Sequence, residues 1–218
     1  RALLTQIAAW RAAGLEAEHT IAILDAPVSA PLIVRARRLG ARLLDRPDVA
    51  ALDEAIRAAD LVRVDYWNHP ALLDTLRRPW PAARILLRMA IRGTTRPHVA
   101  TRELGDFADA LLASSPRTLA TPTAEAVRRR GGPVAWAPAL ADMSRLAGYE
   151  ARPHDGVRIG HVGLIDPAKL HPRFAELCAA VDRSSVHFDI YGPGRLDALR
   201  ERFAALGLAG RTAVHGST

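Results

Sequence analysis

Residues 157–194 contain the side chains and glycines best suited to hold an anion. Lys169 is the single lysine of the chain and follows Gly163, just before a helix pattern that begins with proline. A flexible ammonium group is a compact point charge that suits a diphosphate, and a helix N-terminus also attracts anions. Gly192 and Gly194 follow the next predicted strand, where bare backbone lets a ligand approach closely. We therefore predict a phosphate-binding site, with a solvated lysine and a tight turn as the alternative explanation.

Two further groups of polar residues follow predicted strands in the first half of the chain. Asp65 and His69 come after an apolar strand, where a carboxylate or an imidazole in a cleft could perform acid–base catalysis. A capping aspartate beside a packing tryptophan is the alternative. Arg92, Gly93 and Thr94 follow the next strand and could bind an anionic or hydroxylated group of a substrate. An ordinary turn between a strand and a helix would use the same residue types.

Several other kinds of site are disfavoured by the sequence. The eight histidines show no metal-ligand spacing, and a single cysteine argues against both a zinc site and a disulfide framework. We therefore expect no metal. Cys178 lies on an apolar helical stripe and is expected in the core. Ser114 and Ser115 lack the G-x-S-x-G pattern of a hydrolase nucleophile, and neither a GxGxxG fingerprint nor a Walker loop is present.

The composition favours a globular protein with anionic partners. The formal net charge is +7, with 49% hydrophobic and 24% charged residues. Nucleic acid is a poor candidate because no basic run is interleaved with aromatic residues. The arginines at 35, 38 and 42, with those at 128–130, could touch an anionic membrane or form a solvated helix face. We find no signal peptide and no apolar run near the about 20 residues that span a bilayer, which favours a cytoplasmic protein, at most peripheral to the inner face of the membrane.

The elements that must position these residues alternate between strand and helix. Strands are predicted at 19–24, 41–44, 61–64, 84–91, 110–113, 134–137, 157–164, 186–190 and 212–215. Helices are predicted at 2–13, after Ser29, after the cap Asp48, at 71–78 and 101–107, after the cap Thr123, at 172–181 and from 196 onward. This order predicts an α/β fold of doubly wound parallel sheets with right-handed crossovers.

Four of these helices carry apolar stripes that predict which face is buried. The stripes are Leu3, Ile7 and Trp10; Val49, Leu52 and Ile56; Phe174, Leu177, Cys178 and Val181; and Leu196, Leu199, Phe203 and Leu206. The helix after Ser29 is predicted to carry Arg35, Arg38 and Arg42 on one side.

The alternation is interrupted at 138–156, where prolines, glycines and polar residues gather. Such a composition is typical of a linker between domains. We predict a first domain at 1–140, a linker at 141–156 and a second domain at 157–218. The chain opens inside a helical pattern and stops just after a strand, so we interpret it as a fragment with both domains incomplete.

Taken in order, these motifs resemble those of the GT-B glycosyltransferases of the group 1 (GT4-type) family. The matching segments are 157–164, Lys169, 190–194, 206–208 and 214–216, with 136–142 between the domains and 60–65 and 109–115 on the acceptor side. The resemblance implies two Rossmann-like domains facing a cleft. It also implies that Lys169 steadies the diphosphate of the donor, while Gly163, Gly192, Gly194 and Gly216 line the donor site.

The resemblance further implies the reaction. Members of the family move a sugar from a nucleotide-diphosphate-sugar donor to an acceptor hydroxyl, with retention and without a metal. The nucleotide sugar is a substrate, so no cofactor is expected, and the acceptor would be a sugar, a lipid or a small molecule. A cation and helix N-termini would stabilise the charge that develops on the departing diphosphate.

Three segments depart from the family pattern. Leu164 stands where an arginine often follows the first-strand glycine, and the linker has Ala139 and Leu140 in place of Asn-Gly. Asp65 takes the place of an acceptor-side histidine, unless that histidine is displaced to His69. These departures leave two alternatives open: a non-catalytic nucleotide- or carbohydrate-binding protein on the same scaffold, and a nucleotide-sugar epimerase. The family's glutamate-containing donor motif would lie beyond the last residue, so we expect this fragment alone to be inactive.

Overall fold

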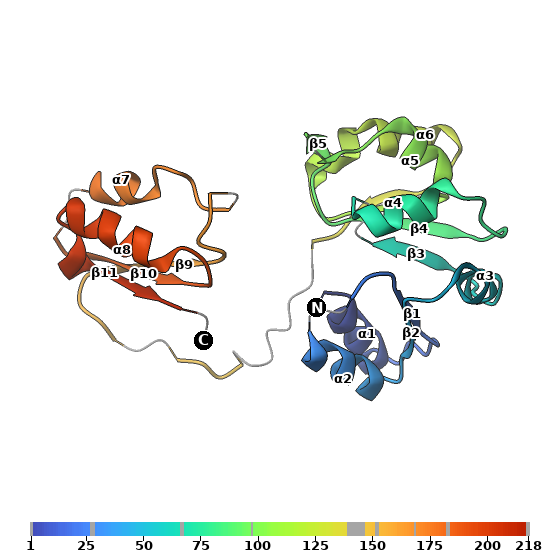
Figure 1. Cartoon of the computed structure of the whole chain (residues 1–218), viewed down its shortest axis with the longest axis horizontal. Helices are drawn as coiled ribbons and strands as arrows, with labels where there is room; N and C mark the ends of the chain where they lie inside the picture. The colour runs from blue at the N-terminus through green and yellow to red at the C-terminus, as the bar shows by residue number, and fades with distance from the viewer. Residues whose placement is uncertain are drawn as a thin grey trace. The chain divides into compact units, whose positions relative to one another are not determined.

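The structure is a computed structural model that describes residues 2–26, 29–65, 68–96, 98–138, 147–150, 153–167, 169–181 and 184–216. The chain divides into two compact units, Arg1–Ala147 and Gly148–Thr218, each with its own sheet (Figure 1). Much of the predicted linker, together with Ala139 and Leu140, lies outside the described residues. None of the helices in the described ranges combines the length and the apolar composition needed to cross a bilayer.

The first unit is built on a parallel four-stranded sheet in the order β3-β4-β7-β8. Its strands are β3 (Val62–Asp65), β4 (Ile85–Met89), β7 (Ala110–Ala113) and β8 (Val134–Trp136), and its main helices are α4 (Pro70–Arg77), α5 (Arg102–Phe107) and α6 (Pro122–Arg129). A 3-10 helix, η1 (Pro116–Ala120), precedes α6. Because the strands are parallel, their carboxyl ends meet at one edge of the sheet.

Side chains alternate between the two faces of this sheet. Leu87, Met89 and Leu111 lie on one face and are almost fully buried with Ala124 and Val127 of α6. Full burial of a large apolar side chain stabilises a fold by about 1.5–3 kcal/mol. The opposite face carries polar residues of β3 and β4, which form part of the candidate site below.

The remaining elements of the first unit lie before β3 and beyond β4. Helices α1 (Ala2–Ala12), α2 (Ala30–Arg38) and α3 (Val49–Arg57) accompany the parallel pair β1 (Thr20–Ile23) and β2 (Arg42–Asp45). Two short strands, β5 (Thr94–Thr95) and β6 (His98–Val99), pair antiparallel. The predicted cap of α3 is confirmed, because the Asp48 carboxylate accepts a hydrogen bond from the Ala51 amide at 2.8 Å.

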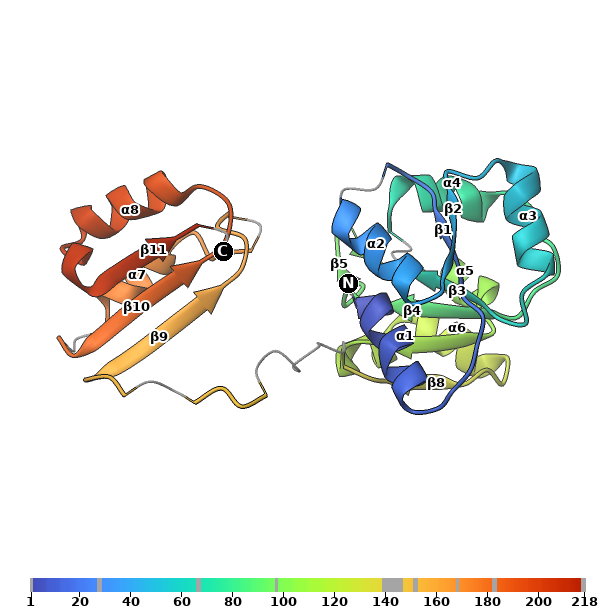
Figure 2. The same ribbon diagram turned by 90° about the horizontal axis from the view of Figure 1, so that it is seen from below.

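The second unit is a parallel three-stranded sheet in the order β11-β10-β9. It contains β9 (Val157–Val162), α7 (Phe174–Ala179), β10 (Val186–Tyr191), α8 (Leu196–Ala205), η3 (Ala209–Arg211) and β11 (Thr212–His215). Both helices pack into one core, where the rings of Phe174 and Phe203 lie edge to face with their centroids 6.3 Å apart. They therefore cover the same face of the sheet, and Figure 2 shows α8 alongside β11. The alternating helices and parallel sheets confirm the predicted α/β fold class.

Three residues predicted to be buried are exposed. Trp10, Val49 and Leu177 each lie at an edge of a predicted stripe and face solvent. In α1 the buried residues are Leu4, Gln6 and Ile7, so the predicted burial of Ile7 is confirmed, whereas Leu4 is more deeply buried than the predicted Leu3. Periodicity gives the direction of a buried face, but only the neighbouring elements decide how wide that face is.

Two local predictions were wrong for identifiable reasons. Arg42 lies in β2, because α2 ends before Gly40, whose φ of 75° is left-handed; the predicted face with Arg35 and Arg38 does not exist. The cap of α6 is Thr121, whose hydroxyl accepts from the Ala124 amide at 3.4 Å. Thr123 is buried inside that helix instead, and its hydroxyl donates to the Thr101 carbonyl at 2.6 Å.

Two of the three arginines at 128–130 have structural partners. Arg130 donates to the carbonyls of Asp106 (2.7 Å), Gly105 (3.1 Å) and Ala108, at the end of α5. Arg128 donates to the Leu119 carbonyl at 2.7 Å. These contacts satisfy carbonyls that a helix end leaves open, and contact of this surface with a membrane stays a prediction.

Candidate functional site

The carboxyl edge of the second sheet brings together the loops that hold all four predicted glycines. The Gly163 amide donates to the Tyr191 carbonyl at 2.9 Å, and the Gly192 amide donates to the Gly216 carbonyl at 3.3 Å. An isolated bridge joins Ile165 to Gly194. The loops after β9, β10 and β11 are therefore in direct backbone contact at this edge.

Gly192 and Gly194 are required by that contact. Their φ values are 146° and 133°, a region that residues with a side chain rarely adopt. A Cβ on Gly192 would overlap the Gly163 carbonyl, and a Cβ on Gly194 would overlap the Ile165 carbonyl. Backbone packing thus explains why both positions are glycine, and their role in donor binding stays a prediction.

Lys169 lies in the loop between β9 and α7. Its amide donates to the Asp166 carbonyl at 2.9 Å, which closes a turn. Its side chain is exposed, and its ammonium group has no hydrogen bond or ion pair with the described residues. The ammonium group is therefore available to a ligand. The helix begins at Phe174 rather than at residue 172 and has only 6 residues, so it lends less to anion binding than the sequence predicts.

A polar cluster on β9, β10 and β11 was not predicted. Arg158 donates from Nε and Nη2 to the two carboxylate oxygens of Asp189, at 2.8 Å each. His215 Nε2 lies 3.5 Å from Asp189 Oδ1. Burial alone raises the pKa of Asp189, but the hydrogen bonds and charge of Arg158, with a smaller part from His215, outweigh it and lower that pKa below its ordinary value.

The sequence carried a signal for this cluster. Asp189 interrupts the apolar run of β10, and it is buried. A buried carboxylate needs a partner, but only the sheet register shows that the partner is Arg158. The same register stacks the rings of Tyr191 and His215, with centroids 4.3 Å apart and planes 8° apart. These flat rings lie directly before Gly192 and Gly216.

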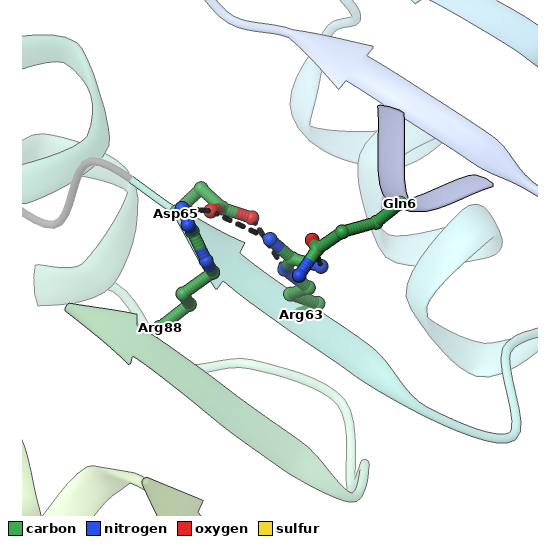
Figure 3. Close-up of polar contacts among 4 residues, drawn as sticks. All are labelled: Gln6, Arg63, Asp65 and Arg88. Atoms are coloured by element: carbon green, nitrogen blue, oxygen red, sulfur yellow. Dashed lines mark hydrogen bonds and ion pairs between the residues drawn. The ribbon is translucent and has the colours of Figure 1, made fainter. Parts of the chain in front are cut away.

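Asp65, a predicted catalytic residue, lies within a cluster of arginines in the first unit (Figure 3). Arg63 Nε is 2.7 Å from Asp65 Oδ2, and Arg88 Nη1 is 3.2 Å from Asp65 Oδ1. Arg63 also donates to Gln6 Oε1 of α1 at 2.7 Å. Both carboxylate oxygens are therefore engaged by guanidinium groups, so Asp65 links β3 to β4, while Arg63 links β3 to α1. Its catalytic role stays a prediction.

His69, the second predicted catalytic residue, has different partners. It is the N-cap residue of α4, and its Nε2 lies 3.7 Å from Asp25 Oδ2, with both side chains largely exposed. Its neighbour Asn68 contacts His98 Nδ1 at 3.2 Å. Tyr66 and Trp67, which separate Asp65 from this pair, lie outside the described residues.

The predicted substrate-binding residues form the turn after β4. The Arg92 carbonyl accepts from the Thr118 hydroxyl at 3.0 Å, and the Arg92 side chain is exposed. Gly93 has a φ of 72°, and a Cβ there would lie 2.6 Å from Met89 Cε. Thr94 is exposed in β5. Packing therefore explains Gly93, whereas Arg92 and Thr94 present side chains that a ligand can reach.

The described residues contain no group of three or more histidine, cysteine, aspartate or glutamate side chains placed to hold a metal ion. In its described part, the second unit presents glycine loops, the exposed Lys169 and an aromatic pair at its carboxyl edge. The first unit presents an arginine–aspartate cluster and an exposed turn at its own carboxyl edge.

The sequence matches no family model and no curated relative. Solved structures match in fold: HepE from Anabaena in complex with UDP (TM-score 0.65), with UDP-glucose (0.62), and with UDP and glucose (0.64). The identity is 12% in each case, over 100% of this chain and 65% of the HepE chain. The chain thus spans about two thirds of HepE and has a fold of the GT-B type, with two Rossmann-like α/β units.

Proposed function

We propose that this chain belongs to a glycosyltransferase whose second unit binds a nucleotide-diphosphate sugar and whose first unit binds the acceptor. The observation that carries the proposal is the carboxyl edge of the second sheet. There the loops of Gly163, Gly192 and Gly216 meet, and the exposed Lys169 lies in the loop that follows Gly163. In open α/β sheets, ligands bind outside the carboxyl ends of the strands. HepE, which shares the fold, binds UDP and UDP-glucose.

The proposed chemistry needs charge stabilisation at the departing diphosphate. Lys169 would supply it as a point charge, because its ammonium has no competing partner among the described residues. The stacked rings of Tyr191 and His215 would offer a flat surface next to the same loops. Following the group 1 resemblance, we propose transfer with retention of configuration and without a metal.

Calorimetry with UDP tests the donor site. Lys169→Ala should weaken UDP binding by about tenfold or more, because a charge-assisted hydrogen bond contributes about 1.5–3 kcal/mol. Lys169→Arg should retain part of the affinity. Arg129→Ala is the matched control, since it also removes an exposed positive charge, but from α6 of the first unit. Equal UDP affinity in the parent chain and Lys169→Ala would remove Lys169 from the donor site.

A non-catalytic nucleotide-sugar-binding protein is the second candidate. The observation that favours it is Asp65, whose two carboxylate oxygens are both occupied by arginines. A screen of nucleotide sugars on the full-length parent protein separates the candidates. Release of the nucleotide, by transfer or hydrolysis, supports the enzyme, whereas tight donor binding without any release supports the binding protein.

A further inference from the structure

The cluster around Asp65 contains one more positive charge than it can neutralise. Two arginines, Arg63 and Arg88, share this single carboxylate, and the third partner, Gln6, is neutral (Figure 3). The side chains of Arg63, Asp65 and Arg88 are only 13%, 18% and 5% exposed. Within the described residues, neither guanidinium bonds a second carboxylate.

Such a surplus is unusual because a buried charge is stable only when it is paired. Removing an unpaired guanidinium from water costs several kcal/mol, about the same order as the stability of a whole domain. The first unit offers a balanced pair for comparison. Arg78 and Asp53 are 2.6 Å apart, with side chains 20% and 19% exposed. An incoming anion would give the Asp65 cluster the same balance.

The position of the cluster indicates where that anion would lie. Asp65 is the last residue of β3 and is in register with Arg88, which in turn is in register with Leu112 of β7. Ser114 comes two residues later and therefore lies on the same side of the sheet as Arg88, closer to the carboxyl edge. Its hydroxyl oxygen is buried and has no hydrogen-bond partner among the residues that the structure describes. A surplus guanidinium on β4 and an unused hydroxyl just past the end of the neighbouring β7 thus lie at the edge where α/β sheets bind ligands.

We propose that Arg88 and Ser114 form a binding site for a phosphoryl group carried by the acceptor substrate. A guanidinium presents a planar fork of donors that suits phosphate oxygens, and a serine hydroxyl can donate to a further oxygen. A phosphate monoester carries about 1.5–2 negative charges at pH 7. The surplus charge of the cluster and the exposed Arg92, which follows the same strand, match that charge. The assignment to the acceptor rests on the proposed function; the anion site itself does not.

The test is a calorimetric titration of inorganic phosphate into the chain carrying Lys169→Ala, so that Lys169 of the second unit cannot contribute. Ser114→Ala should weaken phosphate binding by about tenfold, because it removes a hydrogen bond to a charged group. Arg63→Gln should weaken it at least as much, since Asp65 then neutralises Arg88 alone. Arg78→Gln is the matched control and should leave the affinity unchanged.

Folding is checked for each variant by its unfolding midpoint. Ser114→Ala touches no ion pair, so it keeps the proposal testable even if the arginine variants fold poorly. Phosphate affinity that is unchanged in Ser114→Ala and Arg63→Gln would overturn the site. An equal loss in Arg78→Gln would also overturn it, because the effect would then be general electrostatics.

A second arm identifies the source of the phosphoryl group. Glycerol 3-phosphate should bind at least as tightly as inorganic phosphate if the site receives a phosphoryl group on a larger acceptor. Exclusion of the ester, or preference for glucuronate over both, would overturn the phosphoryl-acceptor assignment. UDP binding is measured in parallel on the chain with Lys169 intact. If the chain binds UDP but its phosphate binding does not depend on Ser114 and Arg63, this inference alone is contradicted. If phosphate binding depends on these residues but the chain does not bind UDP, the proposed function alone is contradicted.

Discussion

At the scale of single residues, Asp189 and Asp65 differ in how their charges are paired. Asp189 has one bidentate arginine partner and a nearby histidine, whereas Asp65 shares its carboxylate between two arginines. The first arrangement leaves the buried carboxylate neutralised. The second leaves a cation in excess, which is why we assign a ligand to it. The same residue type, at or near the end of a parallel strand, thus acts differently in the two units.

Asp189 should make the stability of the second unit depend on pH. Its pKa is lowered in the folded chain, so the folded state binds a proton less readily than the unfolded state. The stabilisation is therefore present above the unfolded pKa of about 4, and it is lost as the pH falls through the lower folded pKa. Asp189→Asn should lower the free energy of unfolding by about 1–3 kcal/mol at pH 7.

Denaturant unfolding of the parent chain and of the Asp189→Asn variant, in the same buffers between pH 7 and pH 2.5, measures this effect. The difference between the two proteins should shrink toward the acid end. A difference that stays constant over the whole range would show that the ionised carboxylate of Asp189 is not what stabilises the sheet.

At the scale of elements, backbone contacts between the loops at the carboxyl edge of the second sheet limit which residues these loops can contain. The Gly192 amide bonds the Gly216 carbonyl, and its Cα lies against the Gly163 carbonyl. No side chain fits between these loops. An arrangement of three loops with little free space is preorganised, which favours the binding of a small rigid ligand.

Gly192→Ala should therefore destabilise the second unit. The left-handed φ alone costs about 1–3 kcal/mol for a residue with a Cβ, and the overlap with the Gly163 carbonyl adds to it. Gly210→Ala is the control, because a Cβ at Gly210 meets nothing within 4 Å and the backbone there is not left-handed. It should change stability by no more than about 0.5 kcal/mol. Urea unfolding followed by circular dichroism measures both, and equal effects would show that the loop contact does not limit this position.

At the scale of the whole molecule, the two units have separate cores. The core of the first includes Leu87 and Leu111, and the core of the second includes Phe188 and Phe203. Each unit is a compact set of contacts within its own range, Arg1–Ala147 or Gly148–Thr218. We therefore expect each unit to unfold largely independently of the other.

Tryptophan fluorescence can follow one unit selectively, because all 4 tryptophans lie before residue 148. Phe203→Ala should destabilise the second unit by about 3–5 kcal/mol, since this side chain is fully buried. The transition seen by fluorescence should not move, while circular dichroism should show an earlier phase. Leu87→Ala, which removes about 2–5 kcal/mol from the first unit, should move the fluorescence transition. A fluorescence shift in Phe203→Ala would show that the units unfold together.

The sequence by itself determined the fold class and most elements, because the signals for them are local. Apolar periodicity, the cap at Asp48 and the turn glycines predict where strands and helices lie. The same local signals predicted the positions of Lys169 and of the glycine loops. They could not say how wide a buried face is, which is why Trp10 and Leu177 were misassigned.

Only the tertiary structure decided which charges meet. Asp65 and Arg88 are 23 residues apart, and Arg158 and Asp189 are 31 apart. Each pair exists because two parallel strands adopt one register, and a shift by one residue would turn either partner to the opposite face. The register is set by the packing of the whole sheet, which no short stretch of sequence contains. The surplus charge beside Ser114, and with it the proposed phosphoryl site, is therefore a property of the folded chain.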